Sequence, residues 1–402
     1  MPIGDKVYFS GLDGSNSLKV SGTNMLLHNF SDNNAQETWL YASAPSAATV
    51  TLTSPAGSTV DLNVSANTEI ALLSGQVLSY GTVVIDPNVN NTVYSIAEQS
   101  DGKILLGGWF NSVGGVTRNR VARLHANGDL DTTFDPNASS DVFEITVQSD
   151  GKILIGGSFS SVGGVTRNRV ARLHANGALD TTFDPNAGST VRSLALQSDG
   201  KIIIGGQFIS VGGVTRWHIA RVHANGALDT TFDPNTNSWV YSIAVQSDDK
   251  FLIGGGFTTV GGAAINRLAR FHANGALDTT FDPNVNDTVY SIVEQSDGTI
   301  LIGGRFTAVG GVTRDGIARL HANGALDTTF DPIINYDVEV ITLQSDGKII
   351  IGGSFSSVGG KTVRRVAFLE QSGALGINPV RDLYVNSTSE VWVRGYVRGH
   401  TT

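Results

Sequence analysis

Residues 149–159 read SDGKILIGGSF, and close copies of this stretch occur five more times in the chain. The GGxF tetrads inside the copies begin 49 residues apart, at Gly107, Gly156, Gly205, Gly254, Gly303 and Gly352. A fixed period of about 40 to 50 residues is typical of propeller blades, because each repeat is one supersecondary unit that buries its faces against its neighbours. The repeat therefore predicts an architecture, and every candidate site has to be weighed against it.

One copy, residues 142–186, can be divided into strands. VFEITVQ alternates apolar and polar residues, KILIGGSF is almost continuously apolar, and RVARLHA supplies a third strand. SDG and NG are turn sequences, and ALDTTFDPN reads as a short outer strand that Pro185 ends. An apolar run of this kind indicates a strand covered on both faces, as happens when blade packs on blade. The pattern predicts an all-β propeller with four antiparallel strands per blade, and a β-solenoid is the weaker alternative.

The number of blades depends on both ends of the sequence. Residues 380–397, VRDLYVNSTSEVWVRGYV, can be aligned with residues 240–257 and read as the first two strands of a seventh blade. GTVVIDPN, residues 81–88, matches the end of the outer strand, DTTFDPN. We therefore expect a seven-bladed β-propeller, in which six full 49-residue repeats are joined by a blade closed by both termini. A six-bladed ring is the alternative.

Two kinds of string carry a resemblance to a known family. GKILIGGSF and RNRVARLHANGALDTTFDPN, with their copies, resemble the delta-60 repeat, a propeller-type repeat related in architecture to WD40 and kelch. The resemblance is strong over residues 86–379 and weak over residues 380–397. It implies a β-propeller and, because such propellers are mostly binding platforms, no particular activity.

Residues 1–80 do not match the repeat and alternate in short apolar segments separated by turn residues. They predict a small β-sandwich-like module, which we assign to residues 1–68 as an attachment domain, with the propeller in residues 69–402. A small β module followed by a large β platform resembles a phage tail fibre or another virion part. The expected location is therefore a virion or an extracellular surface, and further copies of the chain are among the expected partners.

Composition excludes several classes of partner. The net charge is −9, from 27 basic and 36 acidic residues without a Lys/Arg run, which argues against nucleic acid and anionic membranes. The chain has no cysteine, so thiolate metal sites and cysteine nucleophiles are excluded. The start, MPIGDKVYFSG, lacks a signal pattern, and no apolar run approaches the ~18 residues of a membrane helix. A soluble protein is expected.

The repeated polar residues point to structure more than to chemistry. The five histidines His125, His174, His223, His272 and His321 share one register, so they cannot converge on one metal ion. In the last repeat Phe368, Glu370 and Gly376 replace the usual Arg, His and Asp. Their joint loss predicts one polar network within each blade, linking the third and fourth strands.

The aspartates of LDTTFDP, such as Asp180 and Asp184, could be calcium ligands or an acid/base pair, but they recur in every complete copy and lack DxDxDG spacing. GxGxxG, P-loop, GxSxG and HExxH motifs are absent from the sequence. We expect no enzymatic activity, no cofactor and no metal.

Differences between the copies indicate a binding face. The segments after Asp-Pro vary, as do the ends of the connections between the second and third strands. Both connections emerge on one face of a propeller, whereas the constant turns QSDG and HANG emerge on the other. Candidate ligand-binding residues on the variable face are Trp217, Trp239, His218, Tyr336 and Asn237. Aromatic rings beside polar groups are suited to carbohydrate or protein recognition.

The sequence thus favours a non-enzymatic recognition or adhesion protein. Its propeller loops would bind a cell-surface glycan or protein receptor, and its N-terminal module would contact other virion or assembly proteins. Repeated weak sites around one face would add avidity. A structural scaffold or decoration protein and a glycan-degrading enzyme that uses paired acids near the axis are the alternatives.

Overall fold

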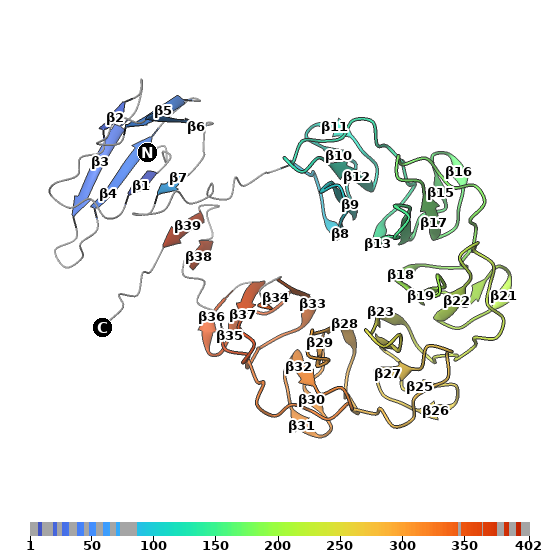
Figure 1. Cartoon of the computed structure of the whole chain (residues 1–402). Helices are drawn as coiled ribbons and strands as arrows, with labels where there is room; N and C mark the ends of the chain where they lie inside the picture. Colours follow the sequence, from blue (N-terminus) through green and yellow to red (C-terminus); the bar gives the residue numbers. More distant parts are fainter. Residues whose placement is uncertain are drawn as a thin grey trace. The chain divides into compact units, whose positions relative to one another are not determined.

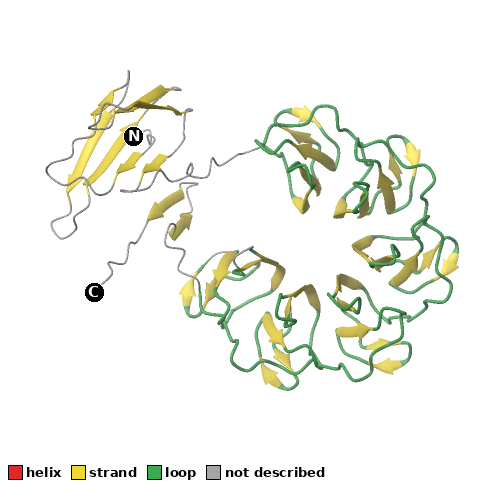
Figure 2. Ribbon diagram, viewed as in Figure 1, coloured by secondary structure: helices red, strands yellow, loops and turns green. Residues whose placement is uncertain are grey.

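The propeller repeats form a series of β-blades, seen in the computed structural model in Figure 1. The structure describes residues 87–344, 347–363 and 365–375, together with the backbone of strands β1–β7, β38 and β39. The described residues contain strands, turns and bends and no helix (Figure 2). Accordingly, no helix that could cross a membrane is found in this part of the chain. The all-β propeller predicted from the sequence is confirmed.

The second blade illustrates the repeat. Its inner strand β13 (Val142–Val147) pairs antiparallel with β14 (Ile153–Gly157), which pairs antiparallel with β17 (Val170–Leu173). The predicted outer strand is reduced to a single bridge between Leu173 and Leu179. All residues of β14 are buried, as its apolar sequence predicts, because neighbouring blades cover both faces of the strand.

The other blades repeat this order around the centre, each beginning with its inner strand (Figure 1). Blade one is β8 (Val93–Glu98), β9 (Ile104–Gly108) and β12 (Val121–Leu124); blade three is β18 (Val191–Leu196), β19 (Ile202–Gly206) and β22 (Ile219–Val222); blade four is β23 (Val240–Val245), β24 (Phe251–Gly255) and β27 (Leu268–Phe271); blade five is β28 (Val289–Glu294), β29 (Ile300–Gly304) and β32 (Ile317–Leu320); blade six is β33 (Val338–Leu343), β34 (Ile349–Gly353) and β37 (Val366–Leu369).

The connection between the second and third strands contains a two-stranded ribbon, which was not expected from the sequence. In blade two it joins β15 (Ser161–Val162) to β16 (Val165–Thr166) through Gly163 and Gly164, whose φ angles are 57° and 77°. Such a turn favours glycine because both central residues have positive φ. The corresponding ribbons are β10 (Ser112–Val113) with β11 (Val116–Thr117), β20 (Ser210–Val211) with β21 (Val214–Thr215), β25 (Thr259–Val260) with β26 (Ala263–Ala264), β30 (Ala308–Val309) with β31 (Val312–Thr313), and β35 (Ser357–Val358) with β36 (Lys361–Thr362).

The hydrophobic core lies between blades. One cluster joins Leu105 and Val121 of blade one to Ile145, Ile155 and Phe159 of blade two. Similar clusters occur along the repeat, so each blade buries its faces against its neighbours as the period predicts.

The chain divides into two compact units, residues 1–86 and residues 87–402. In the first unit β1 (Val7–Phe9) pairs parallel with β7 (Ile70–Leu72), β2 (Lys19–Ser21), β5 (Ala48–Thr53) and β6 (Thr59–Val64) form one sheet, and β3 (Leu26–Ser31) pairs with β4 (Thr38–Ser43). The predicted sandwich packing and the boundary at residue 68 stay predictions.

Near the C-terminal end, β38 (Asp382–Val385) and β39 (Val391–Arg394) pair antiparallel, with Leu383 opposite Val393. This is the hairpin expected for the first two strands of a seventh blade. The segment expected to complete that blade is about residues 69–88. Its residues 73–86 lie outside the described residues, so the closure of the ring stays a prediction.

Candidate functional site

In each of the six described blades, the inner strand contains a β-bulge at its second residue. In blade two the register shifts between Val142 and Glu144, so Phe143 has no partner on β14. The same shift occurs in the other five blades. A bulge bends its strand and re-aims the side chain of the extra residue. The six bulged residues, which we call the bulge ring, are Tyr94, Phe143, Arg192, Tyr241, Tyr290 and Glu339.

The glycine pair of the repeat explains the bulge. The Ser158 N–H donates to the carbonyl of Asp141, 2.9 Å away, at the start of the inner strand. A Cβ on Gly157 would lie 2.0 Å from that carbonyl oxygen. Only glycine therefore allows the second strand to approach the bulged inner strand so closely.

The aromatic members of the bulge ring contact one another across blade boundaries. The rings of Tyr94 and Phe143 are 5.0 Å apart, and those of Tyr241 and Tyr290 are 5.4 Å apart. Trp239, which precedes the fourth inner strand, lies 6.1 Å from Tyr241 in an edge-to-face arrangement. Because Tyr94 is exposed and the other aromatic members are half-buried, the ring presents aromatic surface to solvent.

Charge is distributed unevenly around the bulge ring. Arg192 is its cation, and burial lowers the pKa of this guanidinium while Tyr241, Tyr94 and Asp141 oppose the shift. At blade six the ring ends in the exposed Glu339. Burial, and then the charges of Glu339 and Asp287, raise the pKa of neighbouring Asp337 against the influence of Arg305.

Glu144 is an unusual carboxyl group on the second inner strand. Burial raises its pKa to about 8, against the lowering effect of a hydrogen bond with the backbone of Ile145. Ser95, Ser193, Ser242 and Ser291 occupy the equivalent position in four other blades. The Ser95 hydroxyl accepts a hydrogen bond from the Ile145 N–H of the next blade, at 3.0 Å. The Ser193 hydroxyl accepts the equivalent bond from the Ile243 N–H, at 3.2 Å.

The variable segments contact one another between neighbouring blades. Thr236 N–H donates to the Trp217 carbonyl at 3.4 Å, and the Asn237 side chain accepts the N–H groups of Thr258 and Thr259 in the ribbon of the next blade. The segment after each Asp-Pro thus lies between the strand connections of two blades.

The five predicted ligand-binding residues differ in their availability. Trp217, Trp239 and Tyr336 are exposed. Asn237 is exposed but its amide is used by the ribbon, since it also donates to the Thr258 hydroxyl at 2.8 Å. His218 is buried with positive φ, and its Nδ1 lies 3.0 Å from the Thr236 carbonyl; burial lowers its pKa. The bulge ring was not predicted from the sequence, although its members are the last residues of the variable segments after Asp-Pro.

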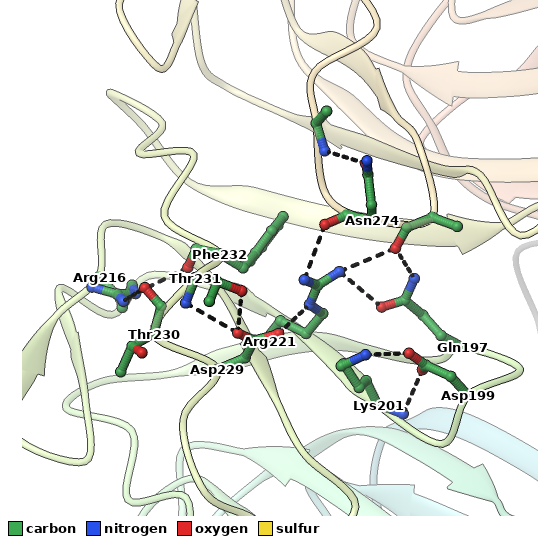
Figure 3. A network of polar contacts seen from close by, with 12 residues as sticks. Gln197, Asp199, Lys201, Arg216, Arg221, Asp229, Thr230, Thr231, Phe232 and Asn274 are labelled. Atoms are coloured by element: carbon green, nitrogen blue, oxygen red, sulfur yellow. Dashed lines mark hydrogen bonds and ion pairs between the residues drawn. The ribbon is translucent and has the colours of Figure 1, made fainter.

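The opposite face carries a repeated polar clasp, drawn in Figure 3. In blade three, Arg221 Nε donates to Asp229 at 2.9 Å, and its Nη groups donate to the carbonyls of Ala273 and Asn274 at 3.1 Å. Ala273 and Asn274 belong to the HANG turn of blade four. The clasp therefore joins successive blades as well as closing one blade, and it contacts Phe232 through a cation–π interaction at 4.9 Å.

The same pair recurs in blades one to five, as Arg123–Asp131, Arg172–Asp180, Arg221–Asp229, Arg270–Asp278 and Arg319–Asp327. The predicted Arg–Asp link is confirmed, but the histidine part of the prediction is wrong. His125, His174, His223, His272 and His321 are exposed, and the turn uses only their backbone groups.

The hydrogen bonds of Asp180 explain its repetition without a metal. Burial would raise the pKa of Asp180, but hydrogen bonds from the Thr182 hydroxyl and N–H and from Arg172 hold it at about 2. Asp184 lies 3.6 Å from Arg167. In the described part of the chain, no group of three or more His, Asp or Glu residues could hold a metal ion.

The repeats match the family described as a domain of unknown function (DUF5122) β-propeller, at residues 99–134, 148–183, 197–232, 246–281, 295–330 and 344–375, more than half of the chain. This chain is a DUF5122 β-propeller. The propeller-type repeat inferred from GKILIGGSF and its copies is thereby confirmed. No curated protein matches this DUF5122 propeller.

The DUF5122 propeller is similar to several solved structures, including these two. The WD40 β-propeller domain of Doa1 is 15% identical, with a TM-score of 0.48, over 82% of this chain and 91% of that one. The streptogramin B lyase structure is 16% identical, with a TM-score of 0.48, over 77% and 91% of the respective chains. The family match establishes the fold, and a β-propeller fits a binding or scaffold role.

Proposed function

We propose that the protein is a non-enzymatic recognition protein and that its ligand, a surface glycan or a protein, binds at the bulge ring on the variable face. The observation that carries this proposal is the repeated bulge, which turns the most variable position of the inner strand toward its counterparts in neighbouring blades. The bulge and the glycine pair beside it are constant from blade to blade, whereas the residue at the bulge changes. Such a division between frame and variable site is typical of binding loops on a rigid scaffold.

The chemistry of the ring supports a saccharide as the first choice. Tyr241, Tyr290 and Trp239 form one contiguous aromatic group with mutually inclined rings. Tyrosine and tryptophan combine an apolar ring face with a polar hydrogen-bonding group, and both are favoured at binding surfaces. The exposed Trp217 and Tyr336 would extend the same surface outward.

The proposal can be tested with the full chain on a glycan array and by binding to whole cells. The Tyr241→Ala/Tyr290→Ala double variant is expected to lose at least ten-fold in affinity, because buried aromatic anchors commonly contribute 2 kcal/mol or more, on the order of thirty-fold. His174→Ala, on the opposite face, is the control. If the double variant binds its ligand as the wild-type protein does, the bulge ring is not the binding site. If that variant also fails to incorporate into a larger assembly, a scaffold role is favoured.

We also propose that the N-terminal unit attaches the propeller to a larger assembly, such as a phage tail. This proposal is supported by the order of a small β unit, residues 1–86, before the propeller unit. Immunogold labelling of purified virus particles with antibody raised against the full chain tests it, and labelling of the cell surface alone would reject a virion location.

A further inference from the structure

Arg192 is placed in the bulge ring with its charge uncompensated. Its guanidinium carbon lies 3.9 Å from the centroid of the Phe143 ring in the preceding blade. Its Nε is buried and has no hydrogen-bond partner among the described residues. Within the same residues, no carboxylate is within ion-pair distance of Arg192, whereas eleven other arginines in the described blades have one.

The acid that acts electrostatically on Arg192 does not compensate its charge. Asp141 influences Arg192 electrostatically, but its carboxylate lies 3.8 Å from Arg120. Toward the other end of the described series of blades, the three acids Asp287, Asp337 and Glu339 outnumber Arg305, the cation that acts on the same groups. An anion would therefore be attracted to blade three and repelled from blade six.

Guanidinium geometry suggests which anion is suitable. An arginine stacked on an aromatic ring is pre-organised, and its planar donors match a carboxylate through two parallel hydrogen bonds. Phe143 lies on one side of Arg192, and Tyr241 belongs to the next blade on the other side. A carboxylate on a sugar ring would thus meet Arg192 while the sugar contacts neighbouring aromatic faces.

We infer that the ligand is an acidic saccharide, of the uronic or sialic acid type, whose carboxylate is bound by Arg192. This inference rests on the proposed function and deepens it by naming the ligand class. The asymmetric charge also fixes the orientation, with the carboxylate at blade three and sugar hydroxyls donating to the acids of blade six.

The test uses the full chain and pairs of oligosaccharides that differ in one group. Uronyl- and sialyl-terminated oligosaccharides are compared with the same compounds after reduction of the carboxyl group to a primary alcohol, and with sulfated neutral analogues. Wild-type protein is expected to bind the acidic forms about ten- to one-hundred-fold more tightly, as for other hydrogen bonds to charged groups. Arg192→Gln should abolish this preference, so that the variant binds the acidic and the reduced forms with equal affinity.

Arg192→Lys should retain part of the preference, because it keeps the charge but not the planar donors. Arg365→Gln, an exposed arginine in blade six, is the matched control and should keep all of it. If the wild-type protein binds the acidic and the reduced forms equally, the inference is overturned. If binding of both forms still depends on Tyr241, the proposed function is nevertheless supported. A preference for sulfated forms overturns the carboxylate assignment, and absence of binding to every acidic oligosaccharide rejects the inference.

Discussion

At the scale of residues, the clasp on the constant face should carry much of the stability. Removing one partner of a buried ion pair leaves the other charge uncompensated and typically costs about 3–5 kcal/mol. Arg172→Ala leaves the Asp180 carboxylate without its ion-pair partner, and it also removes the hydrogen-bond donor to the Ala224 carbonyl of the next blade. We expect its free energy of unfolding, measured in denaturant, to fall by about that amount.

His174→Ala is the matched control for this prediction, because His174 is adjacent in sequence to the clasp but exposed. Its stability should be unchanged. An equal loss in both variants would mean that the turn itself, and not the buried charge, determines the effect.

Glu144 should make stability depend on pH. Its folded-state pKa of about 8 exceeds its ordinary value of 4.5, so between these values the unfolded chain ionises and the folded one does not. Stability contributed by the neutral form is therefore complete below about pH 4.5 and is lost as the pH rises toward 8. Glu144→Gln should raise the melting temperature at pH 8 by several degrees and have little effect at pH 4. A uniform shift at both pH values would contradict this assignment.

At the scale of elements, the glycine pair is the feature that makes the bulge possible. Gly157→Ala places a Cβ against the Asp141 carbonyl, whereas a Cβ on Gly164 meets no atom within 4 Å and is disfavoured only by φ of +77°. We expect Gly157→Ala to cost more than about 2 kcal/mol and Gly164→Ala about 1–2 kcal/mol. Chemical denaturation of both variants compares them directly, and equal losses would argue against a steric role for Gly157.

The strands themselves could be predicted because their period, turns and apolar runs all agree. The Arg–Asp link could also be predicted, since Phe368 and Gly376 depart from the pattern together. The ribbon was missed because strands of two residues carry no measurable alternation, although Gly163-Gly164 is a hairpin signal. The bulge was missed because it depends on an approach between two strands, which the glycines mark without specifying. His218 and Asn237 were chosen by residue type, and their type did not reveal that the backbone of neighbouring loops already binds them.

At the scale of the whole molecule, the two outermost blades expose apolar residues that their counterparts bury. Ile96 in blade one is 67% exposed, whereas Ile145 at the same position in blade two is 3% exposed. Val366 in blade six is 54% exposed, whereas its counterpart Val170 is fully buried. An exposed apolar sheet face indicates a missing neighbour. Both faces are what a seventh blade between them would cover.

This interpretation predicts that Ile96→Asp and Val366→Asp lower the free energy of unfolding by more than about 2 kcal/mol, because each would place a charge in an apolar interface. Val165→Asp, at an exposed position of a ribbon in blade two, should be neutral. If all three substitutions prove harmless in thermal unfolding, the outer faces are in contact with solvent and the ring of seven is rejected.

The clasp has a consequence for inheritance. Each clasp arginine of blades one to five donates a hydrogen bond to a turn of the next blade. Every such contact between blades uses the same kind of side chain at the same spacing along the sequence. Unequal recombination between two copies of the repeat in the gene would insert or delete 49 residues. Each contact between successive blades would still have its arginine donor and its carbonyl acceptor. The identity of the bulged residue, in contrast, would change with each event. Such a gene can exchange binding chemistry one blade at a time without redesigning the contacts between blades.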